Sequence, residues 1–320
     1  MTTRRGFSKA IFMTPVILGM RSLSKSSPAS AQETIPGRIL HVRSDGVHEW
    51  SKGESSRIFE SDMATCARWS PDATRFLFVK SGPSYSDLVI YNIDADSQVP
   101  LTFHQPQYEE GTPEYVHEAA WVTSPEWASN GMIGYMTDYL SPDGTFQVWL
   151  IDGPIGTPYL APASQFEDNI DALSLSSDGS FAAYAVQERQ PDGTSLNRSV
   201  LRDLTDGVAY PLDETRNTFD PAISPDAQSI ALAVRSKDDM SDILIVDRAS
   251  GDLTRVTRNL QATNPCWSPD GNWLAFFRTI DFKFEVWVAP LKEGDPGQPS
   301  LLFKADDLNT RSGLSWTFAS

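Results

Sequence analysis

Basic residues are scarce in this chain of 320 residues, which contains 26 Lys and Arg against 42 Asp and Glu and has a formal net charge of -16. Binding to nucleic acid needs a basic surface that neutralises phosphates and releases their counterions. We therefore expect no nucleic-acid partner. Long apolar runs are absent as well, since no stretch reaches the roughly 18 apolar residues of a membrane-spanning helix. The sequence predicts no transmembrane span.

The first 31 residues have the parts of an export signal. A basic start is followed by a short apolar run at residues 10–20 and by an Ala-x-Ala cleavage pattern that ends at Ala31. The stretch TRRGFSK at residues 3–9 resembles the twin-arginine consensus. We expect cleavage near Ala31 and a periplasmic or extracellular protein whose residues 32–320 form a single domain. The alternative is a disordered N-terminus on a cytoplasmic protein.

One short pattern recurs along the rest of the chain. The string CARWSPDATRFLFVK begins at residue 66, and the similar NPCWSPDGNWLAFFR begins at residue 264. Six units can be aligned on the residue that precedes the Ser-Pro-Asp turn or its equivalent: Trp69, Trp127, Leu175, Ile223, Trp267 and Trp316. These markers are 58, 48, 48, 44 and 49 residues apart. A period of about 40 to 50 residues built from short strands is typical of a β-propeller.

Each unit predicts four short strands that make one antiparallel blade. The marker strand comes first, and the turn after it has Ser to open it, Pro to fix φ and then Asp. Apolar stretches such as RFLFVK at residues 75–80 and DLVIYNID at 87–94 predict the second and third strands. A weaker fourth strand, such as VPLT at 99–102, closes the unit.

The sixth unit is divided between the two ends of the chain. Only four residues follow Trp316, which leaves room for an innermost strand, whereas residues 37–60 read as three strands before the first marker. We expect the last strand to complete the blade that the first three begin, because this closes the ring and removes an exposed edge. The sequence thus predicts an all-β, monomeric, six-bladed β-propeller of four-stranded antiparallel blades.

Repeats of the form W-S-P-D-G followed by an apolar strand, in a ring closed by a terminal strand, resemble the TolB-type six-bladed propellers of bacterial envelopes. The resemblance covers residues 37–320 and is clearest around Trp69, Ile223 and Trp267. It implies a propeller fold, an exported location and a binding role. TolB has an additional α/β domain before its propeller, through which it engages inner-membrane Tol components. We expect no such domain in this chain.

The repeated residues are predicted to be structural. Large aromatic side chains supply apolar surface between blades, and Asp after Pro favours a turn. We assign packing roles to Trp69, Trp127, Trp267 and Trp316, and turn roles to Asp72, Asp226 and Asp270.

The chain has only two cysteines, Cys66 and Cys266. Both fall on predicted innermost strands, those of the first and fifth blades, with the closing blade between them. Their Cα atoms should then be further apart than the roughly 7 Å that a disulfide allows. We predict two buried free thiols.

Function is expected in the loops at one end of the propeller. Links between blades lie at that end, and the longest is residues 102–124. Loops beyond about 12 residues in a compact domain are usually functional or disordered. The aromatic and acidic side chains of this loop predict a binding rim for an envelope protein or peptide, or for a carbohydrate. The candidate binding residues are His104, Tyr108, Glu109, Glu110, Glu114, Tyr115, His117, Glu118 and Trp121.

Neighbouring links add further acids at the same end: Asp168, Asp171, Asp220, Asp238, Asp239, Asp306 and Asp307. A solvated rim that only keeps the protein dispersed is an alternative to binding. A metal site is another. Carboxylates around the channel mouth suit calcium, and His104 and His117 with Glu114 or Glu118 suit zinc or manganese. We assign no other cofactor.

An enzyme is the second hypothesis for function. We name no catalytic residue, because the chain has neither a Gly-x-Ser-x-Gly elbow nor the second domain that follows the propeller in prolyl peptidases. Carboxylates from different blades can nevertheless meet in three dimensions and act on a glycosidic bond. A carbohydrate-active or metal-dependent enzyme therefore stays open beside the binding module.

Overall fold

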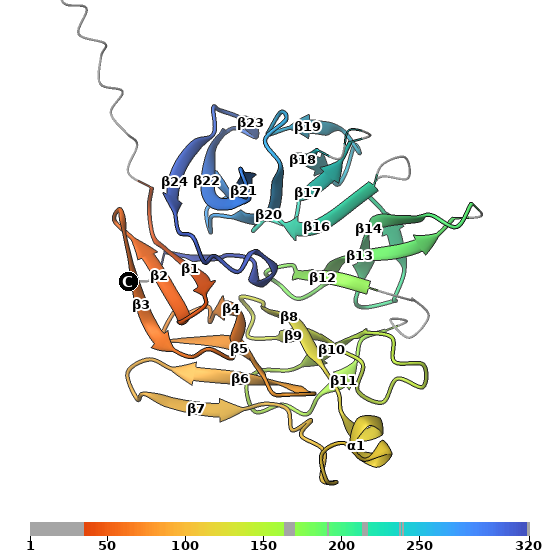
Figure 1. The fold of residues 1–320 in the computed structure, drawn as a ribbon. Coiled ribbons are helices and arrows are strands. Elements are labelled where there is room, and N and C mark those ends of the chain that lie inside the picture. Colours follow the sequence, from red (N-terminus) through yellow and green to blue (C-terminus); the bar gives the residue numbers. More distant parts are fainter. Residues whose placement is uncertain are drawn as a thin grey trace, which may run out of the picture. The chain divides into compact units, whose positions relative to one another are not determined.

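The structure, a computed structural model, describes residues 35–162, 170–190, 192–212, 217–236, 238 and 240–318. The expected leader, Asp168 and Asp239 lie outside these residues. Residues 36–320 make one compact unit, in which six antiparallel sheets surround a central axis (Figure 1). The predicted all-β, six-bladed propeller of four-stranded blades is confirmed.

Five blades follow one another along the chain, and each runs from an inner strand to an outer one. Blade 1 contains β4 (Ala64–Trp69), β5 (Arg75–Ser81), β6 (Ser86–Asn92) and β7 (Ser97–Pro100). Blade 2 contains β8 (Val122–Trp127), β9 (Ile133–Thr137), β10 (Gln147–Ile151) and β11 (Tyr159–Leu160). Blade 3 contains β12 (Ile170–Leu175), β13 (Phe181–Arg189), β14 (Ser195–Asp203) and β15 (Ala209–Pro211).

Blade 4 contains β16 (Asn217–Ile223), β17 (Ser229–Arg235), β18 (Ser241–Asp247) and β19 (Leu253–Arg255). Blade 5 contains β20 (Ala262–Trp267), β21 (Trp273–Ile280), β22 (Lys283–Lys292) and β24 (Ser300–Lys304). A short strand, β23 (Asp295–Pro296), pairs with the end of β22.

Blade 6 closes the ring from both ends of the propeller, as predicted. Its strands, from the inside outwards, are β25 (Ser315–Thr317), β1 (Arg38–Arg43), β2 (Gly46–Ser51) and β3 (Glu54–Glu60). In the β25–β1 ladder Ile39 lies opposite Trp316. The Trp316 indole also donates from Nε1 to the carbonyl oxygen of Pro36 (2.9 Å). The last marker therefore holds the start of the propeller to its end.

Apolar faces of neighbouring blades form the core. Leu77 and Leu88 of blade 1 are buried in one cluster with Ile133 and Tyr135 of blade 2. Each fully buried side chain of this size contributes about 1.5–3 kcal/mol relative to an exposed one. Because both faces of a blade are covered in this way, the second and third strands read as continuous apolar runs.

The three other marker tryptophans contribute to this packing in different ways. Trp69 is buried edge-on against Phe76, with ring centroids 6.3 Å apart. Trp267 donates from Nε1 to the carbonyl oxygen of Ala222 in the preceding blade (2.9 Å). Trp127 is half-buried in the wall of the central channel.

The turns after the markers are held by an aspartate that accepts several hydrogen bonds. In blade 1 the Ser70 hydroxyl donates to Asp72 (2.6 Å), and the Asp72 carboxylate also accepts from the backbone N–H of Thr74 (3.2 Å). The same serine-to-aspartate bond, again 2.6 Å long, recurs at Asp178, Asp226 and Asp270. Hydrogen bonds, first of all from the Ser176 hydroxyl, lower the pKa of Asp178 to about 2.

Each blade has a residue with positive φ three positions before its marker. In blades 1 to 5 this residue lies within a β-bulge, and in blade 6 it is a glycine: Cys66 (52°), Ser124 (47°), Ala172 (57°), Asp220 (48°), Asn264 (48°) and Gly313 (66°). Residues other than glycine rarely adopt this conformation. The positive φ at this position is therefore a feature of the repeat. It cannot be recognised in the sequence, because the six residue types differ.

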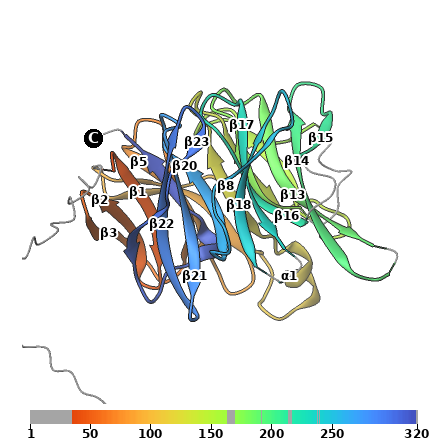
Figure 2. The ribbon, with the colours of Figure 1, turned by 90° about the horizontal axis from the view of Figure 1, so that it is seen from above.

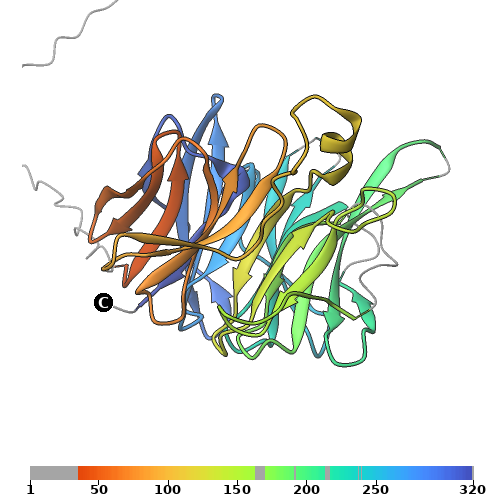
Figure 3. The ribbon, with the colours of Figure 1, turned by 90° about the horizontal axis from the view of Figure 1, so that it is seen from below.

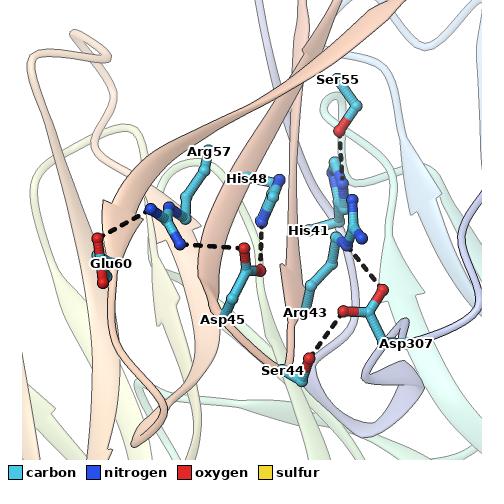
Figure 4. Close-up of polar contacts among 9 residues, drawn as sticks. All are labelled: His41, Arg43, Ser44, Asp45, His48, Ser55, Arg57, Glu60 and Asp307. Atoms are coloured by element: carbon cyan, nitrogen blue, oxygen red, sulfur yellow. Dashed lines mark hydrogen bonds and ion pairs between the residues drawn. The ribbon is translucent and has the colours of Figure 1, made fainter.

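Two buried histidines lie where blade 6 packs against blade 5 (Figure 4). His41 of β1 and His48 of β2 are cross-strand neighbours with ring centroids 5.5 Å apart, and Phe303 of β24 lies 4.7 Å from the His41 ring. His41 Nε2 hydrogen-bonds to the Ser55 hydroxyl (3.0 Å), and His48 Nε2 hydrogen-bonds to Asp45 (2.7 Å). Burial, and then the neighbouring His48, lower the pKa of His41 to about 3.

We predict that His41 makes the propeller sensitive to acid. Below about pH 6.5 the unfolded chain protonates this histidine and the folded chain does not, so the free energy of unfolding falls by up to about 1.4 kcal/mol per pH unit until the pH nears the folded pKa. The change H41Q should reduce that slope and leave the part that comes from His104, whose pKa burial also lowers, whereas H117Q, at an exposed histidine, should keep the full slope. Urea unfolding at about pH 7 and about pH 5 measures both. An unchanged slope in H41Q would contradict the assignment.

Candidate functional site

The segment predicted as the binding loop projects from one end of the propeller. It joins β7 of blade 1 to β8 of blade 2, and its last three expected residues, 122–124, belong to β8. We call residues 102–121 the rim loop and its end of the propeller the rim face. Figures 2 and 3 show that α1 (Pro113–Glu118) within this loop and the β13–β14 hairpin project from the same end.

The start of the rim loop is fixed to the start of β6. The Asp87 carboxylate accepts from the backbone N–H of His104 (2.7 Å) and from the Thr102 hydroxyl (3.0 Å). The buried His104 ring donates from Nδ1 to the carbonyl oxygen of Ser86 (3.0 Å) and stacks on Tyr139, with centroids 5.0 Å apart. Burial lowers the pKa of His104. This histidine therefore positions the loop.

The end of the rim loop is fixed to the same place. The Ser86 backbone N–H donates to the carbonyl oxygen of Ala120 (3.1 Å), and the Ser86 hydroxyl accepts from the N–H of Val122 (2.6 Å). Because both ends meet at Ser86 and Asp87, the segment is a closed surface loop of the kind that often carries function.

The short helix α1 gives the middle of the loop a defined shape. Thr112 caps it by accepting from the N–H of Tyr115 (3.2 Å), and Pro113 occupies the first turn. The Tyr115 ring is buried, and its hydroxyl accepts a hydrogen bond from Ser84 (3.0 Å). The sequence prediction missed this helix, although Thr-Pro-Glu is a recognised helix start.

The nine expected binding residues thus divide into two groups. His104 and Tyr115 are buried and hold the loop in place, so they offer no surface to a partner. Glu118 is exposed but also accepts from the N–H of Gln107 (3.2 Å). The others are exposed on the rim face: Tyr108, Glu109, Glu110, Glu114, His117 and Trp121.

Four exposed apolar residues that the sequence prediction did not name lie on or beside this loop. Phe103 is 79% exposed and Val116 is 68% exposed, while Leu140 (71%) and Tyr139 (41%) come from the connection between β9 and β10. This connection is held against the rim loop by a hydrogen bond from the Trp121 N–H to Asp138 (2.7 Å) and by the stacking of Tyr139 on His104. The rim patch comprises Phe103, Tyr108, Val116, Trp121, Tyr139 and Leu140.

A signal in the sequence coincides with this surface. Residues 81–188 contain no Lys or Arg but 16 Asp and Glu, and the rest of the chain holds 26 of each sign. The whole net charge of -16 is therefore carried by this stretch. It runs from the end of blade 1's second strand into blade 3 and includes the entire rim loop.

The central channel is the other candidate site. It has a volume of about 1150 Å³, and the residue before each marker lines it: Arg68, Glu126, Ser174, Ala222, Cys266 and Ser315. Arg68 donates from Nε to the Glu126 carboxylate (2.7 Å), which joins blades 1 and 2. Both cysteines are free, as predicted, but Cys266 is half-buried and only Cys66 is buried. Burial raises the pKa of the Cys266 thiol to about 12, which disfavours the reactive thiolate at neutral pH.

Two acids from neighbouring blades also line the channel. Burial, together with the nearby Asp171, raises the pKa of Asp220 to about 6. The Asp220 carboxylate accepts from the N–H of Asn264 in blade 5 (3.1 Å). Unlike these two, Asp306 and Asp307 pair with Lys283 (3.2 Å) and Arg43 (2.8 Å).

Within the described residues, no three His, Cys, Asp or Glu side chains lie close enough to hold a metal ion together. The expected set of His104, His117, Glu114 and Glu118 is not assembled, because His104 is directed into the protein. In the same part of the chain, no helix has the length and apolarity to cross a membrane.

No protein-family model matches the sequence. Several solved structures nevertheless have a similar fold. TolB from Acinetobacter baumannii superposes with a TM-score of 0.66 at 14% identity, over 88% of this chain and 66% of that one. A protein described as a TolB from Agrobacterium tumefaciens gives 0.63 at 16% identity, over 88% and 98%. An oligogalacturonate lyase from Vibrio parahaemolyticus gives 0.53 at 13% identity, over 83% and 73%.

The likeness to the TolB structures agrees with the resemblance in the repeats. This chain spans just under two thirds of the Acinetobacter TolB chain and nearly all of the Agrobacterium chain. Because identities are this low, and because a lyase shares the architecture, the comparisons establish the fold and not the activity. The chain is a six-bladed β-propeller with the fold of the TolB proteins.

Proposed function

We propose that this protein is an exported recognition module that binds another protein through the rim patch. The observation that supports this is a group of six exposed apolar side chains, four on a loop whose two ends are clamped at Ser86 and Asp87 and two on the adjacent connection between β9 and β10. Exposed apolar side chains gathered on one part of a surface are typical of interaction sites. The export signal predicted at residues 1–31 is part of this proposal.

The clamps explain why the patch suits binding. Ordering a loop on binding costs about 0.5–1.5 kcal/mol for each side chain that is immobilised. Here Tyr115, His104 and the cap at Thr112 already hold the loop in one shape. A rim that served only to keep the protein dispersed would need the acids but not Phe103 or Leu140, which solvent disfavours.

We predict that truncating the patch abolishes capture of the partner. The purified protein and a variant with Phe103→Ala and Leu140→Ala would each be used as bait in a cell-envelope extract of the source organism, with mass spectrometry of what is retained. The wild type should retain a specific protein, and the variant should lose it by about tenfold or more, because exposed anchors of this kind are worth roughly 1–3 kcal/mol each.

A matched control separates the patch from general stickiness. Ile155, in the turn between β10 and β11 at the opposite end of the propeller, is 98% exposed. The change I155A should leave capture unchanged. Equal capture by the wild type and by the Phe103 and Leu140 variant, or no specific capture at all, would refute the proposal.

A second candidate function, a carbohydrate-active enzyme, is favoured by Asp171 and Asp220 in the channel. A carboxyl group whose pKa is raised towards neutral pH can serve as a general acid or base. Burial, together with the nearby Asp171, raises the pKa of Asp220 to about 6. The lyase that shares the fold acts, by its name, on oligogalacturonate.

If this candidate is correct, the protein converts an oligosaccharide, and D220N lowers the rate at least about hundredfold because the proton-transfer group is lost. The assay would follow oligosaccharides, oligogalacturonate among them, by mass spectrometry. D238N, at an exposed aspartate that does not line the channel, is the control and should keep the activity. No product with the wild type, or full activity in D220N, would exclude this role.

A further inference from the structure

We propose that the partner segment bound by the rim patch is basic, a Lys- or Arg-rich stretch that also carries large apolar side chains. This inference rests on the proposed binding function and names the chemistry of its ligand. It is based on the exposed apolar side chains of the rim patch and on the exposed glutamates of the rim loop.

Acids beside the patch have no cation of their own. Glu109, Glu110 and Glu114 are exposed on the rim loop, and the ion pairs of the described chain include none of the three. The reason lies in the sequence, because the 108 residues from 81 to 188 supply no Lys or Arg side chain.

Several acids elsewhere in the protein form ion pairs with Arg. At the seam of blades 5 and 6, Asp307 pairs with Arg43 (2.8 Å), and Asp45 pairs with Arg57 (3.1 Å), as Figure 4 shows. In blade 4, Asp242 pairs with Arg255 (2.9 Å). Some acids outside residues 81–188 thus have a basic partner, whereas the ion pairs of the described residues include none of Glu109, Glu110 and Glu114. Charge complementarity at an interface then requires the partner to bring the cations.

The aromatic side chains of the patch fit the same ligand. Lys and Arg bind over the faces of Trp and Tyr rings, and the effect strengthens when water is excluded. This protein uses the contact internally, for example where Arg75 lies 5.3 Å from the Trp127 ring. Tyr108, Trp121 and Tyr139 are exposed, and the cation–ring contacts of the described residues include none of these three rings. Basic side chains of a partner can lie on these rings while its apolar side chains meet Phe103 and Leu140.

The negative charge of the rim loop disfavours other classes of ligand at the rim patch. The acids of the rim loop would repel nucleic acids and anionic lipid surfaces, and an acidic peptide would place like charges opposite each other. An uncharged apolar peptide would leave the rim acids without partners. These occupants give different outcomes in the test below.

The test is a selection with a random library of 12-residue peptides displayed on phage, run against the purified protein and against the Phe103→Ala and Leu140→Ala variant. Binders that need the patch should contain about twice the Lys and Arg of the unselected library, together with Phe, Tyr, Trp or Leu. Binders that need the patch but are neutral or acidic would overturn this inference and leave the binding function standing. If no binder depends on the patch, the binding function fails and this inference fails with it.

The affinity of the most enriched peptide then tests the individual charges. E109Q/E110Q/E114Q should weaken its binding about tenfold at low salt, and added salt should reduce that difference. E54Q/D252N/E293Q removes three exposed charges outside residues 81–188 and should change the affinity less than about twofold. Equal losses in both triple variants would show that only net charge matters and would overturn the proposal.

Discussion

Pairing of β25 with β1 is the constraint on which the rest of the structure depends. Only three residue pairs form this ladder, yet they join residues at opposite ends of the propeller. The link before β25 adds a hydrogen bond from the Asn309 N–H to the carbonyl oxygen of Val42 (2.9 Å). Without this closure, the apolar faces of blades 1 and 5 would lose the blade between them. Closure also fixes the rim loops in a ring, so that loops of separate blades act as one surface.

Within that ring, the rim loop shows how a propeller can present apolar side chains without losing order. Ser86 and Asp87, at the start of β6, bind both ends of the loop, and Tyr115 packs its middle inwards. Ser86, which holds the loop, is buried and Asp87 is half-buried, whereas the apolar side chains of the patch are exposed. Under the proposed function, a partner protein would cover these apolar side chains, and the acids beside them would favour basic side chains.

The sequence was sufficient to predict the architecture because its signals are local. Ser-Pro-Asp turns and short apolar runs repeat at a fixed spacing, and Trp316 lies too near the end of the chain to begin a full blade. The site depended on contacts that no local pattern shows. His104 and Tyr115 resemble exposed loop residues in the sequence, but in the fold they are buried and contact Ser86, Ser84 and Tyr139, which come from other segments. The lack of Lys and Arg over residues 81–188 was readable, but only the fold places it around the patch.

The central claim, that the rim patch meets a partner in the cell, is tested most directly by photo-crosslinking in living cells of the source organism. A photoreactive phenylalanine analogue would replace Leu140 in one strain and Ile155, at the opposite end of the propeller, in another. The account predicts a discrete crosslinked protein from position 140 and none from position 155. A crosslink from position 155 alone, or from neither position, would contradict it.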